Sequence, residues 1–117
     1  VGYTAWLADE DLMDAVTAVS GSGPAYVFHL IECLAQAGVE VGLEPELSAR
    51  LALQTVAGSG ELARQSEDDA AQLRINVSSP GGTTLAALDV LMADGGLQAL
   101  MTAAVRAAEQ RGRELGA

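Results

Sequence analysis

The sequence predicts an all-α fold, a bundle of five or six helices. Apolar residues recur at spacings of three and four along most of the chain, which places them on one face of a helix. Glycine, proline or short acidic runs separate these segments, as expected at helix ends. Half of the 117 residues are hydrophobic but only 3% are aromatic, so the core must be aliphatic. Because small aliphatic side chains supply few large anchors, we expect a partner chain to complete that core.

The first seven residues are the exception to this pattern. Apolar side chains alternate from Val1 to Leu7, as they do in a β-strand. A single strand cannot stand alone, and the sequence contains no second one. The segment is therefore either a strand that belongs to something upstream or a frayed terminus.

The first two predicted helices meet at a glycine-rich break. Acidic residues over 9–11 open the first helix, where the positive end of the helix dipole favours them. Residues 20–23 interrupt that helix. Pro24 suits the first turn of the second helix, with Ser22 or Gly23 as its cap. Gly38 is expected to end the second helix.

The rest of the chain is predicted to form four more helices. They are expected over 46–64, 70–75, 83–93 and 97–114. A turn at 42–45 leads into the first of them, and its apolar middle predicts burial on several sides. An acidic capping segment, Ser-Glu-Asp-Asp over 66–69, precedes the short second one. The last two are separated by a Gly-Gly pair.

Charge and composition exclude several classes of function. The chain carries sixteen acidic and six basic residues, a formal net charge of −10, which argues against nucleic acids and anionic membranes as partners. The sequence contains no signal peptide and no 18-residue apolar run, so we expect a cytoplasmic protein. Two Gly-Ser-Gly segments lie in helical patterns rather than after a strand, so neither predicts a dinucleotide site.

The single cysteine and the single histidine are interpreted as structural residues. Cys33 has apolar neighbours and is expected to be buried, and a lone cysteine excludes an intrachain disulfide. His29 has no cluster of cysteine, histidine or carboxylate residues at metal-binding spacing around it. We therefore predict a hydrogen-bonded helix histidine and no metal site.

The strongest candidate for a functional site is the segment over 76–84, NVSSPGGTT, ahead of a predicted helix. Pro80 and the two glycines allow a tight turn, and backbone N–H groups at a helix start attract anions. The segment supplies four hydroxyls within seven residues, whereas a helix cap needs one. These neutral groups suit the binding of a small carboxylate, and a cofactor would have to supply the reactivity. A capped loop-to-helix joint without a ligand is the alternative.

Two motifs in order resemble the C-terminal domain of pyrroline-5-carboxylate reductases: DAVTAVSGSGPAYV over 14–27 and NVSSPGGTTLAAL over 76–88. The resemblance covers essentially the whole chain. It implies that residues 1–8 are the strand leaving a missing N-terminal Rossmann domain. It also implies that 9–117 form a helical dimerisation and substrate-binding domain, which interlocks with a second copy in a homodimer. Many family members assemble five such dimers into a decamer.

The same resemblance implies roles for residues of the 76–84 segment. The substrate carboxylate is held by Ser79 and by the backbone of Gly81, Gly82 and Thr83. Thr84 also binds the substrate, by bonding its ring nitrogen, and is the candidate catalytic residue. Asn76 and Val77 match positions near the nicotinamide end of the cofactor, NADPH or NADH, which the missing domain mainly binds.

The function that the resemblance implies is reduction of 1-pyrroline-5-carboxylate to L-proline with NAD(P)H, in proline biosynthesis. We expect the 117-residue chain by itself to be inactive, because the cofactor-binding half is absent. Two alternatives remain. One is a purely structural helical dimerisation module, and the other is a related reductase that acts on a different imine or hydroxy acid.

Overall fold

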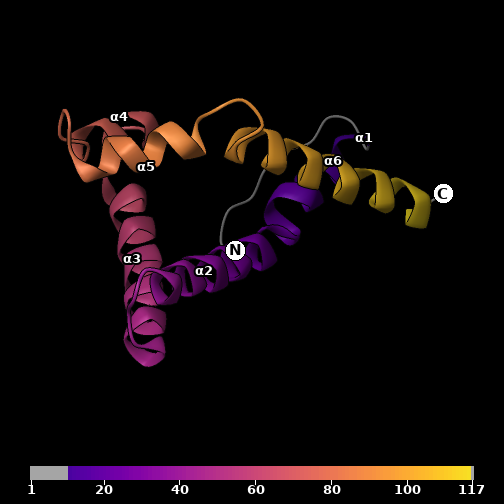
Figure 1. The fold of residues 1–117 in the computed structure, drawn as a ribbon. Coiled ribbons are helices and arrows are strands. Elements are labelled where there is room, and N and C mark those ends of the chain that lie inside the picture. The colour runs from indigo at the N-terminus through magenta and orange to yellow at the C-terminus, as the bar shows by residue number, and fades with distance from the viewer. Residues whose placement is uncertain (1–10, 117) are drawn as a thin grey trace. The chain divides into compact units, whose positions relative to one another are not determined.

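A computed structural model describes residues 11–116, and Figure 1 shows them as helices joined by short turns. No strand occurs among these residues, so the all-α prediction is confirmed for them. The predicted strand over 1–7 and the first acidic residues of the first helix lie outside the described residues. The chain divides into two compact units, one over 27–89 and one that joins the described residues on either side of it. The predicted domain boundary at residue 8 stays a prediction.

The unit that joins the two ends of the described chain holds α1 (Asp11–Val16), η1 (Thr17–Gly21) and α6 (Leu97–Gly116). The last helix, predicted over 97–114, packs along both α1 and η1. Ala18 of η1 is only 1% exposed. Gly112 lets α6 approach α1 closely, because a Cβ atom there would lie 2.8 Å from Asp14 Oδ1.

The predicted break over 20–23 takes the form of a π-helix, η1, followed by a bend at Ser22. The hydroxyl of Tyr26 donates a hydrogen bond to the Ala18 carbonyl oxygen at 2.6 Å. A π-turn is wider than an α-turn and is unusual in a helix, and here a side chain from the next helix bonds one of its carbonyls. That next helix is α2 (Gly23–Glu40), with Pro24 in its first turn as predicted.

The prediction that Gly38 ends this helix is wrong, because α2 continues to Glu40 and the chain reverses at Gly42. Gly42 has φ +109°. The N–H groups of Gly42 and Leu43 donate to the carbonyl oxygens of Val39 and Gly38, both at 3.0 Å. This pattern is a Schellman motif, in which glycine adopts the left-handed conformation without steric cost.

Gly38 instead allows α3 (Pro45–Gln65) to cross α2 closely. A Cβ atom at Gly38 would collide with Ser48 Oγ. That hydroxyl donates to the Ala35 carbonyl oxygen at 2.7 Å, and Ser48 is 2% exposed. The crossing therefore depends on the missing side chain at one position and on a buried, hydrogen-bonded serine at the other.

The third helix, α3, begins at Pro45, one residue before the predicted start at Glu46. Glu44 caps it, since its carboxylate accepts hydrogen bonds from two backbone N–H groups of the first turn at 3.1 and 2.9 Å. The prediction that the middle of this helix is buried on several sides is wrong for the single chain. Leu51 and Leu53 there are 47% and 52% exposed, because no other element among the described residues covers them.

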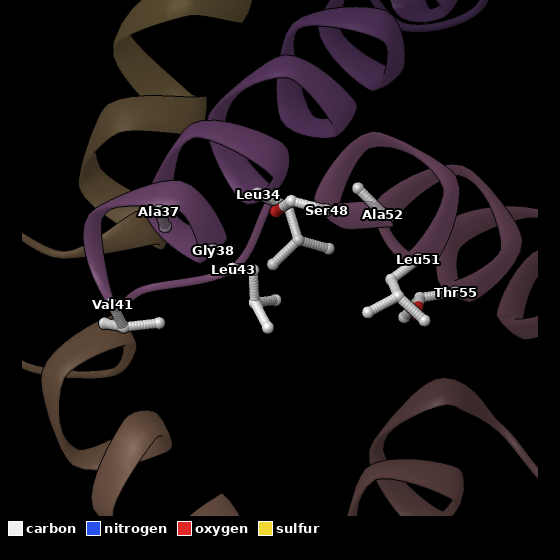
Figure 2. Close-up of a pocket in the computed structure, with 9 residues that line it drawn as sticks. All are labelled: Leu34, Ala37, Gly38, Val41, Leu43, Ser48, Leu51, Ala52 and Thr55. Carbon is white, nitrogen blue, oxygen red and sulfur yellow. The ribbon is translucent and has the colours of Figure 1, made fainter. Parts of the chain in front are cut away.

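Much of the aliphatic surface of the single chain is uncovered. Among residues 12–116 the buried ones are Ala18, Ser48 and Ala52. An open groove of about 390 Å³ follows α2, the next turn and α3, and its apolar lining includes Leu34, Val41, Leu43 and Leu51. Figure 2 shows these side chains gathered on one side of the two helices. A large apolar surface left in water is typical of a face that another chain covers.

Two shorter helices follow α3: α4 (Ala70–Asn76) and α5 (Thr83–Leu91). Asp69 caps α4, and its carboxylate accepts a hydrogen bond from the Gln72 N–H at 2.9 Å, as the acidic run predicts. α5 ends two residues before the predicted 93, and Gly95, with φ +76°, turns the chain towards α6. None of the described helices has the length and hydropathy of a membrane span.

Candidate functional site

The segment from the end of α4 to the start of α5 contains all seven predicted site residues. Two backbone hydrogen bonds close the end of α4. The Val77 N–H donates to the Leu73 carbonyl oxygen at 3.3 Å, and the Ser78 N–H donates to the Ile75 carbonyl oxygen at 3.0 Å. Only residues 77–82 separate the two helices, so the helix ends determine where the segment between them lies.

Residues 79–82 form a tight turn, closed by a hydrogen bond from the Gly82 N–H to the Ser79 carbonyl oxygen at 3.1 Å. Pro80 is its second residue, and Gly81, its third, has φ +72°. This is the arrangement of a type II turn, which needs a residue that tolerates positive φ at the third position. Gly82 has a separate constraint, because a Cβ atom there would lie 3.2 Å from the Ser79 carbonyl oxygen.

The turn leads directly into the N-terminus of α5, where backbone donors are free. The first i→i−4 hydrogen bond of this helix runs from the Ala86 N–H to the Gly82 carbonyl oxygen at 3.4 Å. Within the described part of the chain, the N–H groups of Thr83 and Thr84 have no acceptor. A negative charge beside a helix N-terminus is stabilised by about 0.3–1 kcal/mol at an exposed site. This end of α5 therefore attracts an anion.

The four hydroxyl groups of the segment differ in what they bond. Ser79 and Thr83 are exposed, and Thr84 is half-buried in the first turn of α5. The Ser78 hydroxyl instead donates to the Arg74 carbonyl oxygen at 2.6 Å. Three hydroxyls are thus left for a ligand at the turn, and the fourth belongs to the end of α4.

The two residues predicted to lie near the cofactor are at the end of α4. Asn76 is exposed, and its Oδ1 accepts a hydrogen bond from Gln72 Nε2 at 2.8 Å. This bond orients the amide and leaves its NH₂ group for another acceptor. Val77 is 65% exposed. Sequence reasoning missed Gln72, although its i, i+4 spacing from Asn76 is a signal for such a pair.

Residues 76–84 include no titratable side chain, so their chemistry is limited to hydrogen bonding. Backbone N–H groups and hydroxyls can hold a carboxylate and bond one further polar atom. The segment supplies no strong general acid or base, and any transfer of electrons would have to come from a bound cofactor.

The single histidine and the single cysteine, which the sequence predicts to be structural residues, both lie on α2. His29 Nδ1 is 3.1 Å from Glu32 Oε1, and His29 Nε2 is 3.4 Å from Cys33 Sγ. His29 is therefore hydrogen-bonded, as predicted. The prediction of a buried Cys33 is wrong, because its side chain is exposed among the residues that the structure describes. Among the described residues, no three histidine, cysteine or acidic side chains form a group suited to a metal ion.

Residues 10–115 match the protein family described as pyrroline-5-carboxylate reductase dimerisation. The pyrroline-5-carboxylate reductase of Pseudomonas aeruginosa is 50% identical to this chain over 115 residues, and that of Synechocystis sp. is 53% identical over 107 residues. These alignments cover 98% and 92% of this chain but 42% and 40% of the relatives. The chain thus spans about two fifths of the length of these curated relatives.

Solved structures of relatives share the fold. The pyrroline-5-carboxylate reductase of Coxiella burnetii aligns with a TM-score of 0.91 and 43% identity, over 98% of this chain and 42% of that one. The Plasmodium falciparum pyrroline carboxylate reductase, solved with NADP bound, aligns with a TM-score of 0.86 and 42% identity. That alignment covers 93% of this chain and 41% of the relative. Both similarities therefore extend over nearly all of this chain.

Proposed function

Because the chain belongs to the pyrroline-5-carboxylate reductase family, through that family's dimerisation domain, we propose that it is the dimerisation and substrate-binding part of such a reductase. The reaction is the NAD(P)H-dependent reduction of 1-pyrroline-5-carboxylate to L-proline, in proline biosynthesis. One observation carries the proposal. Free N–H groups and three hydroxyls meet at the N-terminus of α5, in a segment without charged side chains.

The substrate carboxylate lies at the 79–82 turn. Gly82 uses its N–H to close the turn, so it contributes shape rather than a donor. The donors left for the anion are the N–H groups of Gly81 and Thr83 and the hydroxyl of Ser79. Several neutral donors at a helix N-terminus bind a carboxylate without the cost of burying a charged partner.

Thr84 is the catalytic residue in this proposal. Its half-buried hydroxyl follows the carboxylate donors by one residue and donates to the ring nitrogen of the imine. That bond orients the ring and places the hydroxyl proton at the nitrogen, which must gain a proton as the neighbouring carbon takes the hydride. A nicotinamide cofactor, when bound, supplies the hydride.

The cofactor is NADPH or NADH, and this chain contributes only Asn76 and Val77 at its nicotinamide end. The side chains fit that role, because the Asn76 amide keeps its NH₂ group for an acceptor and Val77 exposes an apolar surface. Most of the cofactor site lies in sequence that this chain does not include, since the relatives are more than twice as long.

The partner is a second copy of the chain. The apolar groove between α2 and α3 and the exposed leucines of α3 support an interlocked homodimer, and five such dimers form a decamer in the complete enzyme. The cytoplasm is the proposed location.

The experiment is an amide NMR titration of the chain with L-proline and, separately, with its ring-oxygen analogue. Saturable shifts confined to about residues 78–84 are expected, because both ligands carry the carboxylate that the free N–H groups bind. A folded dimer whose amide signals move with neither ligand contradicts the proposal for this chain and favours the purely structural module.

A further inference from the structure

We propose that Ser78 is a positioning residue for the substrate site: its hydroxyl ties the 79–82 turn to the end of α4 and so sets where the carboxylate donors stand. The inference rests on the proposed function, because it concerns the donors assigned there to the substrate. It assigns Ser78 no contact with substrate or cofactor.

The local geometry singles out Ser78 among the hydroxyl residues of the segment. Its Oγ donates to the Arg74 carbonyl oxygen at 2.6 Å, and its N–H donates to the Ile75 carbonyl oxygen at 3.0 Å. Arg74 lies in the last turn of α4, where carbonyl groups have no partner in the helix. Ser78 is also half-buried, whereas Ser79 and Thr83 are exposed.

The hydroxyl of Ser78 is not free to serve the ligand as a donor. A serine hydroxyl carries one proton, and here that proton is directed to the Arg74 carbonyl oxygen. A carboxylate only accepts hydrogen bonds, so Ser78 has nothing to offer it while this bond is intact. Its influence on the substrate must therefore pass through the backbone.

The turn transmits that influence because it has little freedom of its own. It begins at the residue after Ser78, its φ at Pro80 is held by the ring, and its ends are joined by the Gly82 N–H bond to Ser79. A tight turn that is anchored at Ser78 on one side and continues into α5 on the other moves as one piece. Loss of the Ser78 anchor shifts the Ser79 hydroxyl and the Gly81 N–H together, relative to Thr84.

The test compares Ser78→Ala with Ser78→Thr in the reductase that carries this domain, and also measures L-proline binding to the chain by amide NMR. For Ser78→Ala we expect KM for pyrroline-5-carboxylate and the Kd for L-proline to rise about tenfold, with kcat within roughly twofold of wild type. Ser78→Thr keeps the hydroxyl and should restore both constants. If Ser78→Ala does not fold, Ser78→Cys replaces it, and its weaker donor should raise both constants by a smaller factor.

Asp69→Ala is the matched control, because it removes a side-chain cap from the other end of the same short helix. Asp69→Ala should lower the melting temperature but leave KM, kcat and the Kd for L-proline at their wild-type values. The proposal is overturned if Ser78→Ala or Ser78→Cys keeps wild-type KM and Kd, or if Asp69→Ala raises them equally. A wild-type reductase without turnover and a wild-type chain without proline binding would instead contradict the proposed function itself.

Discussion

Thr84 carries the most specific prediction at the scale of the single residue. Its hydroxyl is half-buried in the first turn of α5, and the proposed mechanism uses it at the imine nitrogen. Thr84→Ala in the complete reductase should lower kcat by about 10²–10³-fold, the usual cost of removing one donor aimed at a reacting atom. Steady-state kinetics measures this loss.

The loss at Thr84 must come from chemistry and not from instability. Thr84→Ser keeps the hydroxyl and should retain most of the turnover, and Thr84→Ala should change the free energy of unfolding by less than about 1 kcal/mol. An unchanged kcat in Thr84→Ala would remove this residue from the mechanism.

Two glycines predict opposite effects of the same substitution. Gly81 has φ +72°, so Gly81→Ala forces an L-residue into the left-handed region and should destabilise the fold by about 1–2 kcal/mol. Gly58 lies inside α3, and among the described residues a Cβ atom added there would meet nothing within 4 Å beyond the backbone of its own helix. Gly58→Ala should therefore stabilise the chain by about 0.5–1 kcal/mol. Urea unfolding of both variants measures the difference.

The Gly58 result also reports on the partner chain. Apart from its own helix backbone, no described atom of the single chain lies within 4 Å of the position that this Cβ atom would take. A helix interior favours alanine over glycine, so Gly58→Ala should not by itself destabilise α3. If the substitution nevertheless destabilises the dimer, a helix of the second copy must cross α3 at this position.

At the scale of the element, the crossing of α2 and α3 in the 27–89 unit depends on a close contact between Gly38 and Ser48. A Cβ atom at Gly38 would collide with the buried hydroxyl of Ser48, so Gly38→Ala should cost about 1–3 kcal/mol of stability by overpacking. Differential scanning calorimetry or chemical unfolding measures this cost.

A double-mutant cycle tests whether the cost arises at this contact. Ser48→Ala loses the bond to the Ala35 carbonyl oxygen but removes the atom with which the new Cβ would collide. The double variant should therefore be more stable than the sum of the two single changes predicts. Strict additivity would mean that the helices separate elsewhere to admit the methyl group.

At the scale of the whole molecule, the uncovered aliphatic surface predicts self-association. Leu34 lines the α2–α3 groove and is 42% exposed in the single chain. Leu34→Glu would place an unpaired charge in a covered apolar face and should raise the dimer Kd at least about tenfold. Sedimentation equilibrium at several concentrations measures it.

Gln36→Glu is the control for that experiment. It adds the same charge to the same helix, two residues along and therefore on a different face. Its Kd should match that of the wild type. A well-folded wild-type monomer at micromolar concentration would contradict the dimer.

The sequence predicted most helix boundaries because the signals that set them are local. Pro45 at the start of α3, the acidic cap before α4 and the Pro-Gly-Gly turn before α5 each act within a few residues of their own position. The same locality made the 76–84 segment visible as a candidate site, since tight turns and helix starts carry their own residue preferences.

The helical class, the tight turn before α5 and the family resemblance could all be read from the order of residues, because propensity, capping and motif order are properties of neighbours along the chain. The roles of particular side chains could not be predicted from the order of residues. The folded chain uses Gly38 at a helix crossing instead of a helix end, directs the Ser78 hydroxyl to Arg74 instead of to a ligand, and leaves Cys33 exposed. These outcomes depend on what lies opposite each residue in space, and spacing along a chain does not contain that information.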